Sequence, residues 1–304
     1  MSANTARAYT PAGLLAAAIG VFGWGCGVLI IKSTTSPFLI VAFYRHVISL
    51  PILFVAWRFT KDRTLPWRAA SIGGLLFAAH QIAHLSSLRY STAAVVTILF
   101  SLQPIIVGAL GHRLMGELTT KRFYTWSLVA VSGCAVLVVA SSGQAGSTPL
   151  GTVLAIANLV IWSMYYVATK HARAHTGAIA WMLVMTLVSG VCITVLTLAF
   201  RQPLALESGH ELGLLALLAI GPATGGHLLV TWSHTRVHVA ASSALNLGVP
   251  IIASIGAALF LDEPFGPWQI LGALIALGGT LMAMRSLPPP VAAESTVRFG
   301  EVAT

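Results

Sequence analysis

Two stretches of this 304-residue chain match each other: Pro104-Ile105-Ile106-Val107-Gly108-Ala109-Leu110 and Pro250-Ile251-Ile252-Ala253-Ser254-Ile255-Gly256. Each proline is followed thirteen residues later by a glutamate, which is Glu117 in the first copy and Glu263 in the second. The offset between the copies is 146 residues. Because a repeated segment of this kind reflects a repeated structural unit, it constrains the fold before any single residue is considered.

A second match lies upstream in both halves and has an offset of 138 residues. The first copy holds Thr10-Pro11-Ala12-Gly13, Trp24 and Lys32, and the second holds Thr148-Pro149-Leu150-Gly151, Trp162 and Lys170. The chain is therefore interpreted as two copies of one unit, over residues 12–140 and 150–284, with tails at residues 1–11 and 285–304.

The composition indicates a membrane protein. Hydrophobic residues make up 57% of the chain and charged residues only 8%, whereas soluble domains carry about 25% charged residues. The net charge of +9 comes from Lys and Arg placed singly or in small groups between apolar runs, which argues against nucleic acid as a partner. Cys26, Cys134 and Cys192 all fall inside apolar runs and fit neither a disulfide framework nor a metal-binding spacing.

Ten apolar runs are long enough to cross a bilayer as helices, and their continuity argues against the alternating pattern of barrel strands. The predicted helices span residues 12–31, 37–57, 69–88, 91–111, 124–140, 150–169, 178–200, 213–232, 239–261 and 267–284. Most Lys and Arg lie on one side if both termini are inside, so we expect an inner (plasma) membrane protein with cytoplasmic termini.

Five helices per copy is an odd number, so the second copy must enter the membrane upside down. An all-helical bundle of two inverted five-helix repeats can open to either side, which is the basis of alternating access. On this arrangement Glu117 lies at the inner face and Glu263 at the outer face.

These features together resemble the drug/metabolite transporter superfamily of the EamA type. The resemblance rests on Trp24, Lys32, Arg45 in the second span, the segment from Pro104 to Glu117, and the segment from Pro250 through Leu261-Asp262-Glu263-Pro264. It covers about residues 12–285. It implies an inverted-repeat bundle that moves small metabolites, most often by exporting amino acids or related compounds, with a central cavity to which the third and eighth helices contribute.

The most polar stretch inside any predicted span contains His80, Gln81 and His84. His80 and His84 are four residues apart and share one helix face, and the 146-residue offset aligns Gln81 with His227. Ionisable residues inside a membrane indicate function by default. The resemblance places the third and eighth helices at the central cavity, so His80, Gln81, His84 and His227 are predicted to contact the substrate. Two other interpretations stay open: histidines hydrogen-bonded to neighbouring groups, and an i, i+4 pair that binds a metal or haem.

Trp24 and Trp162 are equivalent in the two copies and lie mid-span rather than at the interfaces. Two tryptophans facing one cavity would offer stacking or cation–π surfaces to an aromatic or cationic substrate, and Tyr166 follows Trp162 by one helical turn. Packing alone is the alternative explanation for these aromatic residues.

A further set of residues is predicted to be gating or structural. Pro104 and Pro250 are expected within helices, where a missing N–H makes a kink or hinge; simple tolerance of proline in membrane helices is the alternative. Arg45 needs an acceptor or must reach the interface, and no nearby acid offers one. Lys32 and Lys170 end matched helices, where a cation favours the helix dipole; Glu117 and Glu263 complete the set.

No P-loop, HExxH or GxSxG pattern is present, so we expect no catalytic residue, no metal and no cofactor. The leading prediction is a secondary transporter that exports a small amino-acid-like or aromatic or cationic metabolite. Histidines are the candidate groups for coupling transport to protons, and a uniporter without coupling is the alternative. A multidrug or quaternary-amine carrier is the alternative within transport, and a membrane-embedded enzyme or haem protein is the alternative from another class.

Overall fold

The computed structural model describes residues 9–91, 93–140, 148–263 and 265–288. Pro264, the linker at 141–147 and most of both predicted tails lie outside these ranges. The described residues form helices and one isolated bridge between Tyr9 and Val237.

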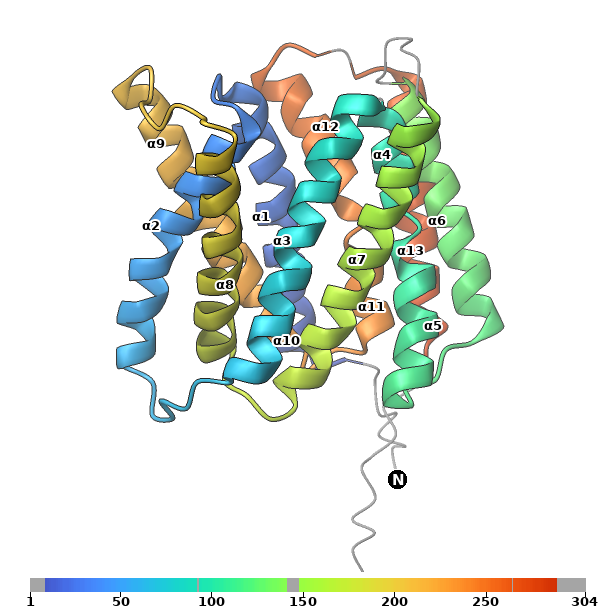
Figure 1. The fold of residues 1–304 in the computed structure, drawn as a ribbon. Coiled ribbons are helices and arrows are strands. Elements are labelled where there is room, and N and C mark those ends of the chain that lie inside the picture. Colours follow the sequence, from blue (N-terminus) through green and yellow to red (C-terminus); the bar gives the residue numbers. More distant parts are fainter. Residues whose placement is uncertain (1–8, 92, 141–147, 264, 289–304) are drawn as a thin grey trace, which may run out of the picture.

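The helices are α1 (Pro11–Ser33), α2 (Phe38–Arg58), α3 (Trp67–Tyr90), α4 (Ala93–Phe100), α5 (Gln103–Met115), α6 (Lys121–Ala140), α7 (Pro149–Arg173), α8 (Ala178–Ala199), α9 (Gly209–Leu218), the π-helix η1 (Ala219–Gly226), α10 (His227–Ser233), α11 (Val239–Leu245), α12 (Gly248–Phe260) and α13 (Pro267–Arg285). They stand side by side as one bundle (Figure 1).

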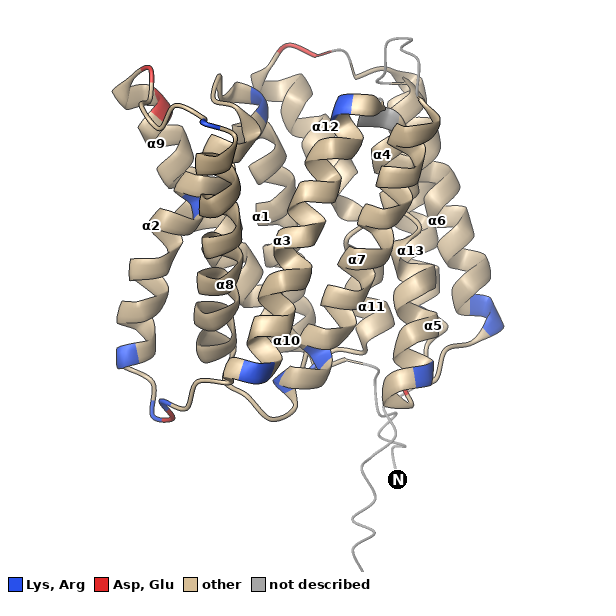
Figure 2. Cartoon of the chain, in the orientation of Figure 1, with Lys and Arg blue, Asp and Glu red and all other residues tan. Residues whose placement is uncertain are grey.

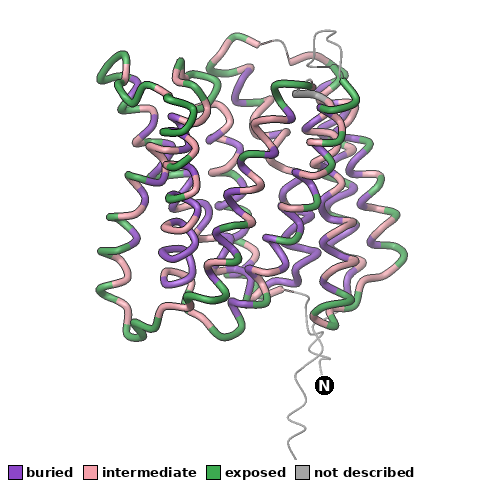
Figure 3. The backbone as a smooth tube through the Cα atoms, in the orientation of Figure 1, coloured by how far each residue is buried: buried purple, intermediate pink, exposed green. Residues whose placement is uncertain are grey.

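The two ends of the bundle are distinguished here as the proximal end, where α1 begins and α5 ends, and the distal end, where α1 and α12 end (Figure 1). Most Lys and Arg residues gather at the proximal end (Figure 2). Large apolar side chains such as Leu15, Phe22 and Leu128 are exposed on the sides of the bundle, where the tube view also places much of the exposed surface (Figure 3). Many exposed apolar side chains around the sides of the bundle suit contact with lipid.

Within the described ranges, nine helices are long and apolar enough to cross a membrane. The segments α4–α5, α9–η1–α10 and α11–α12 each count as one of these spans. Helix α3 has 24 residues but is not among the nine, because its polar stretch of His80, Gln81 and His84 lowers its mean hydropathy. The prediction of a helical membrane protein is therefore confirmed for the described residues.

The two repeated prolines lie at helix breaks rather than inside continuous helices. Helix α4 ends at Phe100 and α5 begins at Gln103, so Pro104 occupies the first turn of the second segment. Helix α11 ends at Leu245, and Pro250 is the third residue of α12. The predicted unbroken helices are therefore wrong in detail, because proline lacks an N–H and its ring clashes with the preceding turn, which favours a new helix start.

A third break was not predicted. Between α9 and α10 the chain forms the π-helix η1, which contains Pro222. A π-helical turn accommodates residues that interrupt the usual hydrogen-bond ladder, and such turns are frequent at functional sites.

The matched sequence at Thr10 and Thr148 produces matched helix starts. The hydroxyl of each threonine accepts a hydrogen bond from the N–H of the glycine three residues later, at 3.1 Å in both copies. Pro11 and Pro149 follow as the first helical residues of α1 and α7. A threonine cap followed by proline is a favourable way to begin a helix.

Helices α6 and α13 approach closely through small residues. A side chain on Gly133 would collide with the backbone of Ala276, and one on Gly279 would collide with the backbone of Ala130. Small residues allow this close backbone approach, which is how helices often associate in membranes.

Candidate functional site

A cavity of about 590 Å³ occupies the interior of the bundle and reaches its distal end. Its walls come from both halves of the chain and include Trp24, Lys32, Arg45, Phe77, His80, Gln81, His84, Phe100, Gln103, Pro104, Trp162, Pro222, His227, Asn246, Pro250 and Glu263. Its volume is in the range that holds a small-molecule ligand.

Six of the seven residues predicted to contact substrate border this cavity. Tyr166 does not: its ring packs behind Trp162 with 6.1 Å between centroids, and its hydroxyl lies 2.7 Å from the Ser242 hydroxyl. Tyr166 therefore supports the cavity wall from the side away from the cavity.

Aromatic rings form a continuous cluster around Trp162. The ring of His80 lies 4.5 Å from it and that of Trp24 lies 5.8 Å from it, edge-on at 70°. Phe77 and Phe100 also pack against Trp162. The two repeat-equivalent tryptophans thus meet, but in a T-shaped contact rather than as opposite walls of a cage.

The polar residues of the predicted site fall into two groups. His84 and His227 have partners within the protein: Nδ1 of His84 lies 3.3 Å from Asn158 Nδ2, and Nε2 of His227 lies 3.1 Å from the Tyr165 hydroxyl. Nδ1 of His80 and Nε2 of Gln81 have no hydrogen-bond partner among the described residues. Buried polar groups are usually hydrogen-bonded, so these two atoms are exceptions; both are buried from solvent and would need a local shift of the cavity wall to bond a ligand.

Arg45 borders the cavity. Its guanidinium carbon stands 5.1 Å from the centre of the Phe77 ring, which is cation–π distance. No carboxylate within the described ranges lies at ion-pair distance from it. A guanidinium that is not neutralised by an acid attracts an anionic ligand.

Three amide side chains near the site were not predicted. Asn158 touches His84, while Gln103 and Asn246 border the cavity and bond to each other, with Asn246 Nδ2 donating to Gln103 Oε1 at 2.9 Å. The signal was available in the sequence, because neutral amides inside long apolar runs are as unusual as the histidines that were singled out.

The repeated lysines and glutamates pair across the two halves. At the distal end Lys32 contacts Glu263 at 2.8 Å, and both side chains are nearly half exposed, at 47% and 42%. At the proximal end Lys170 contacts Glu117 at 3.0 Å, with side chains only 14% and 20% exposed. Each pair joins a lysine from one half to a glutamate from the other.

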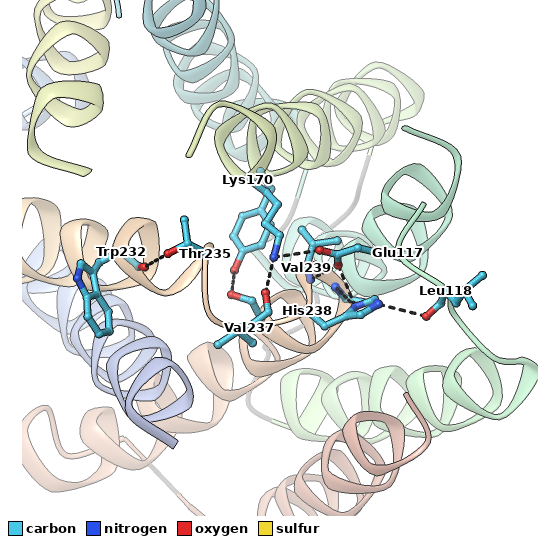
Figure 4. A network of polar contacts seen from close by, with 11 residues as sticks. Glu117, Leu118, Lys170, Trp232, Thr235, Val237, His238 and Val239 are labelled. Carbon is cyan, nitrogen blue, oxygen red and sulfur yellow. Dashed lines mark hydrogen bonds and ion pairs between the residues drawn. The ribbon is translucent and has the colours of Figure 1, made fainter. Parts of the chain in front are cut away.

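The proximal pair belongs to a larger network (Figure 4). Oε2 of Glu117 accepts a hydrogen bond from the Val239 N–H at 2.6 Å and lies 3.2 Å from His238 Nδ1. Nε2 of His238 lies 3.1 Å from the Leu118 carbonyl, and Lys170 also donates to the Val237 carbonyl. The dipole explanation for the two lysines is thus incomplete, since both make specific ion pairs.

Only the distal pair borders the cavity. The proximal network does not, and it stands at the end of the bundle that the cavity does not reach. The cavity is therefore accessible from the distal end and closed at the proximal end.

No cluster of three or more His, Cys, Asp or Glu side chains within the described ranges is arranged to hold a metal ion. His84, one member of the proposed i, i+4 pair, uses Nδ1 in its contact with Asn158.

Comparison with known proteins adds independent information. The model of the EamA-like transporter family matches residues 11–139 and 149–285. A probable terminal-alkyne amino-acid exporter of Streptantibioticus cattleyicolor is 28% identical over 231 residues, which is 74% of this chain and 75% of the relative. The aromatic amino acid exporter YddG of Ancylobacter novellus is 28% identical over 232 residues, which is 72% of this chain and 78% of the relative.

A solved structure has a TM-score of 0.78 to this chain at 21% identity, over 89% of this chain and 96% of the other. This likeness shows a shared fold. The family model matches most of the chain, the relatives are named as exporters, and the predicted resemblance is confirmed. The chain belongs to the EamA-like transporter family, whose members are membrane transporters and not enzymes.

Proposed function

We propose that this protein is a secondary active transporter of a bacterial inner membrane that exports a small amino-acid-like metabolite by alternating access. The observation that carries the proposal is the cavity of about 590 Å³, which both halves of the chain line and which is closed at one end only. A binding site between two halves, accessible from one side at a time, is the arrangement that alternating access requires.

The proposal includes ten membrane spans in two inverted five-helix repeats, with α3 as the tenth. Packing between the halves supports it: α1 contacts α12 and α10, and the equivalent helix α7 contacts α5 and α3. The contact of Gly133 with Ala276 has its counterpart in the contact of Gly279 with Ala130, at the 146-residue offset of the sequence. Helices α1 and α7 also run in opposite directions (Figure 1).

We assign the proximal ion pair to the gate that is closed in this structure and the distal ion pair, which is nearly half exposed, to the rim of the open end. The basic proximal end would face the cytoplasm, by the excess of Lys and Arg there (Figure 2). Both termini would then be cytoplasmic, and the cavity would be open to the outside. A tag near residue 145 and a tag at the N-terminus should accordingly be accessible from opposite sides of the membrane; accessibility from one side would contradict the inverted repeat.

We propose a carboxylate-bearing substrate with an apolar or aromatic body. Arg45 supplies the cation for the carboxylate, and Trp24, Phe77, Phe100 and Trp162 supply apolar walls. Arg45 disfavours the alternative of a quaternary-amine carrier, because its guanidinium would repel a cationic substrate in the cavity. The exporters of terminal-alkyne and aromatic amino acids among the relatives fit this substrate class.

Counterflow in proteoliposomes tests the proposal. Vesicles loaded with unlabelled L-phenylalanine should accumulate labelled L-phenylalanine transiently, without ATP, and empty vesicles should not. A thermal-shift screen of amino acids on the detergent-solubilised protein extends the test to other substrates, since a ligand stabilises the state that it binds. Failure of every carboxylate to exchange or to stabilise the protein would contradict the substrate class.

We further propose that protons act on the proximal gate through His238. Burial and the nearby Lys170 lower the pKa of His238, and Glu117 partly opposes them. The other charged side chains of neighbouring elements include Arg113, Lys121 and Arg285, which are exposed, and Arg236, which is half-buried. Once the gate opens, water reaches the imidazole and its pKa returns towards about 6.5. The open state then binds the proton more tightly than the closed state, so acid favours opening.

We therefore expect opening of the proximal gate to increase as the pH falls from 7.5 to 5.5. The increase is limited to about tenfold for each unit by which the pKa of His238 differs between the closed and the open state. Counterflow measured across this range should show the dependence when opening limits the rate. His238→Gln should flatten the profile, because glutamine does not titrate. A profile that His238→Gln leaves unchanged would assign the pH dependence to another group.

A further inference from the structure

Two helix breaks from opposite halves of the chain are joined by a pair of amide side chains. Gln103 begins α5, directly after the break that follows α4, and Asn246 lies in the break between α11 and α12. Asn246 Nδ2 donates to Gln103 Oε1 at 2.9 Å. Asn246 is only 8% exposed and Gln103 only 1% exposed. Both residues border the central cavity.

This pairing leaves two of the four polar side-chain atoms without a hydrogen-bond partner among the described residues. Two facing amides can make two hydrogen bonds to each other, but here they make one. Nε2 of Gln103 and Oδ1 of Asn246 are buried from solvent and have no hydrogen-bond partner among the described residues, so a ligand reaches them only when the cavity wall shifts locally. Rotating both amide groups by 180° exchanges the atoms but still leaves one donor group and one acceptor free. The free donor and free acceptor are therefore a property of the pair itself.

We propose that Gln103 and Asn246 form a subsite for a neutral part of the substrate that both donates and accepts a hydrogen bond, such as a hydroxyl or an amide. The proposal rests on the proposed transport function. A carboxylate at this place would use the Gln103 N–H but would face the Asn246 oxygen. An ammonium group would use the oxygen but would face the N–H. A hydroxyl or amide satisfies both.

The aromatic wall connects this subsite to Arg45. Phe77 lies under the guanidinium, Trp162 lies 6.3 Å from Phe77, and Phe100 lies 5.9 Å from Trp162. Phe100 ends α4, three residues before Gln103. The cavity thus offers a cation, then an aromatic surface, then the amide pair. The substrate class that this order fits is an amino acid whose apolar body ends in a hydroxyl or amide.

The subsite also bears on the transport cycle. Its two residues come from breaks at equivalent places in the two halves, so a bound hydroxyl or amide bridges the halves directly. Such a ligand holds the two breaks in one relative position, which ties occupancy of the cavity to the movement of the halves.

Binding of matched amino acids to the purified full-length protein tests the proposal. L-Tyrosine differs from L-phenylalanine by one hydroxyl, and L-glutamine differs from L-norleucine by its amide. We expect tyrosine and glutamine to bind about tenfold more tightly than their partners, the ratio for one ordinary hydrogen bond. Quenching of tryptophan fluorescence gives the dissociation constants.

Asn246→Leu and Gln103→Met should each reduce both ratios to about one. Gln269→Leu is the control, because Gln269 is a buried amide that lies outside the cavity and bonds the Ala140 carbonyl; it should keep both ratios. Using two separate variants protects the test against misfolding of one, and thermal unfolding identifies a misfolded variant.

The outcomes separate this proposal from the proposed function. Binding of phenylalanine without preference for tyrosine or glutamine would overturn the subsite, with the amides holding only water, and would leave the carboxylate transporter intact. Ratios that persist in both variants would also overturn it. Absence of binding by all four amino acids would overturn the proposed substrate class and the subsite with it.

Discussion

Arg45→Gln is expected to lower counterflow of L-phenylalanine by roughly 10- to 150-fold. The reason is that Arg45 borders the cavity with no carboxylate of the described chain at ion-pair distance, so its charge is available to the substrate carboxylate. A hydrogen bond to a charged group contributes about 1.5–3 kcal/mol, which corresponds to this range. Arg45→Lys should retain part of the activity, because lysine keeps the charge but loses the bidentate geometry.

Arg58→Gln is the matched control, since Arg58 is an exposed arginine at the end of the same helix. The methyl ester of phenylalanine sharpens the test: its binding should not fall in Arg45→Gln, because the ester lacks the anion and its remaining ammonium is no longer repelled by Arg45. Wild-type counterflow in Arg45→Gln would remove Arg45 from the substrate site. Equal loss of acid and ester binding would instead indicate a structural role through Phe77.

Glu117→Gln is expected to open the proximal end of the bundle. Glu117 pairs with Lys170 and accepts the Val239 N–H, and its loss leaves a mostly buried lysine without its carboxylate. Breaking such an interaction costs roughly 1–3 kcal/mol, a shift of about 5- to 150-fold in the equilibrium between closed and open states. Glu263→Gln should have a much smaller effect on the distal end, because exposed ion pairs contribute about 0–1 kcal/mol.

Labelling of a buried cysteine measures this opening. Ser242 is fully buried on α11, one helical turn from both His238 and Asn246. Ser242→Cys, in a chain in which Cys26, Cys134 and Cys192 are replaced, reports access of an impermeant maleimide from the proximal side. Glu117→Gln should raise the labelling rate by about 5- to 150-fold, and Glu263→Gln should leave it nearly unchanged.

A charge exchange provides a further check on the gate. Glu117→Lys combined with Lys170→Glu should restore part of the closure, because the ion pair is rebuilt with its polarity reversed. Slow labelling in Glu117→Gln itself would mean that other contacts keep the proximal end closed.

Sequence periodicity and the repeated segments were sufficient to predict the helical membrane fold and the family. The breaks were harder to predict. Pro104 and Pro250 marked the correct places, but a proline pattern does not distinguish a kinked helix from two segments, since that depends on whether the neighbouring turns remain hydrogen-bonded. The π-helix around Pro222 left no periodic signal at all.

The candidate site was predicted only where side chains are conspicuous. His80, Gln81, His84 and His227 stood out as polar groups in apolar runs and do border the cavity. The pairing of Lys32 with Glu263 depends on how the halves pack, and these residues are 231 positions apart. The same is true of Gln103 and Asn246, which are 143 positions apart. Tyr166 illustrates the limit of helical spacing, because its position on α7 did not reveal that its ring lies behind Trp162.

The close contact between α6 and α13 has a consequence for biosynthesis. Gly133 sits against Ala276, and Gly279 sits against Ala130, so the groove on α6 receives its partner only when the last helix has left the ribosome. Until then the small residues on α6 that pack against α13 face the lipid without their partner helix. Proteins truncated before residue 267 should accordingly be recognised by membrane quality control and degraded, even though every span of the first half has already been inserted.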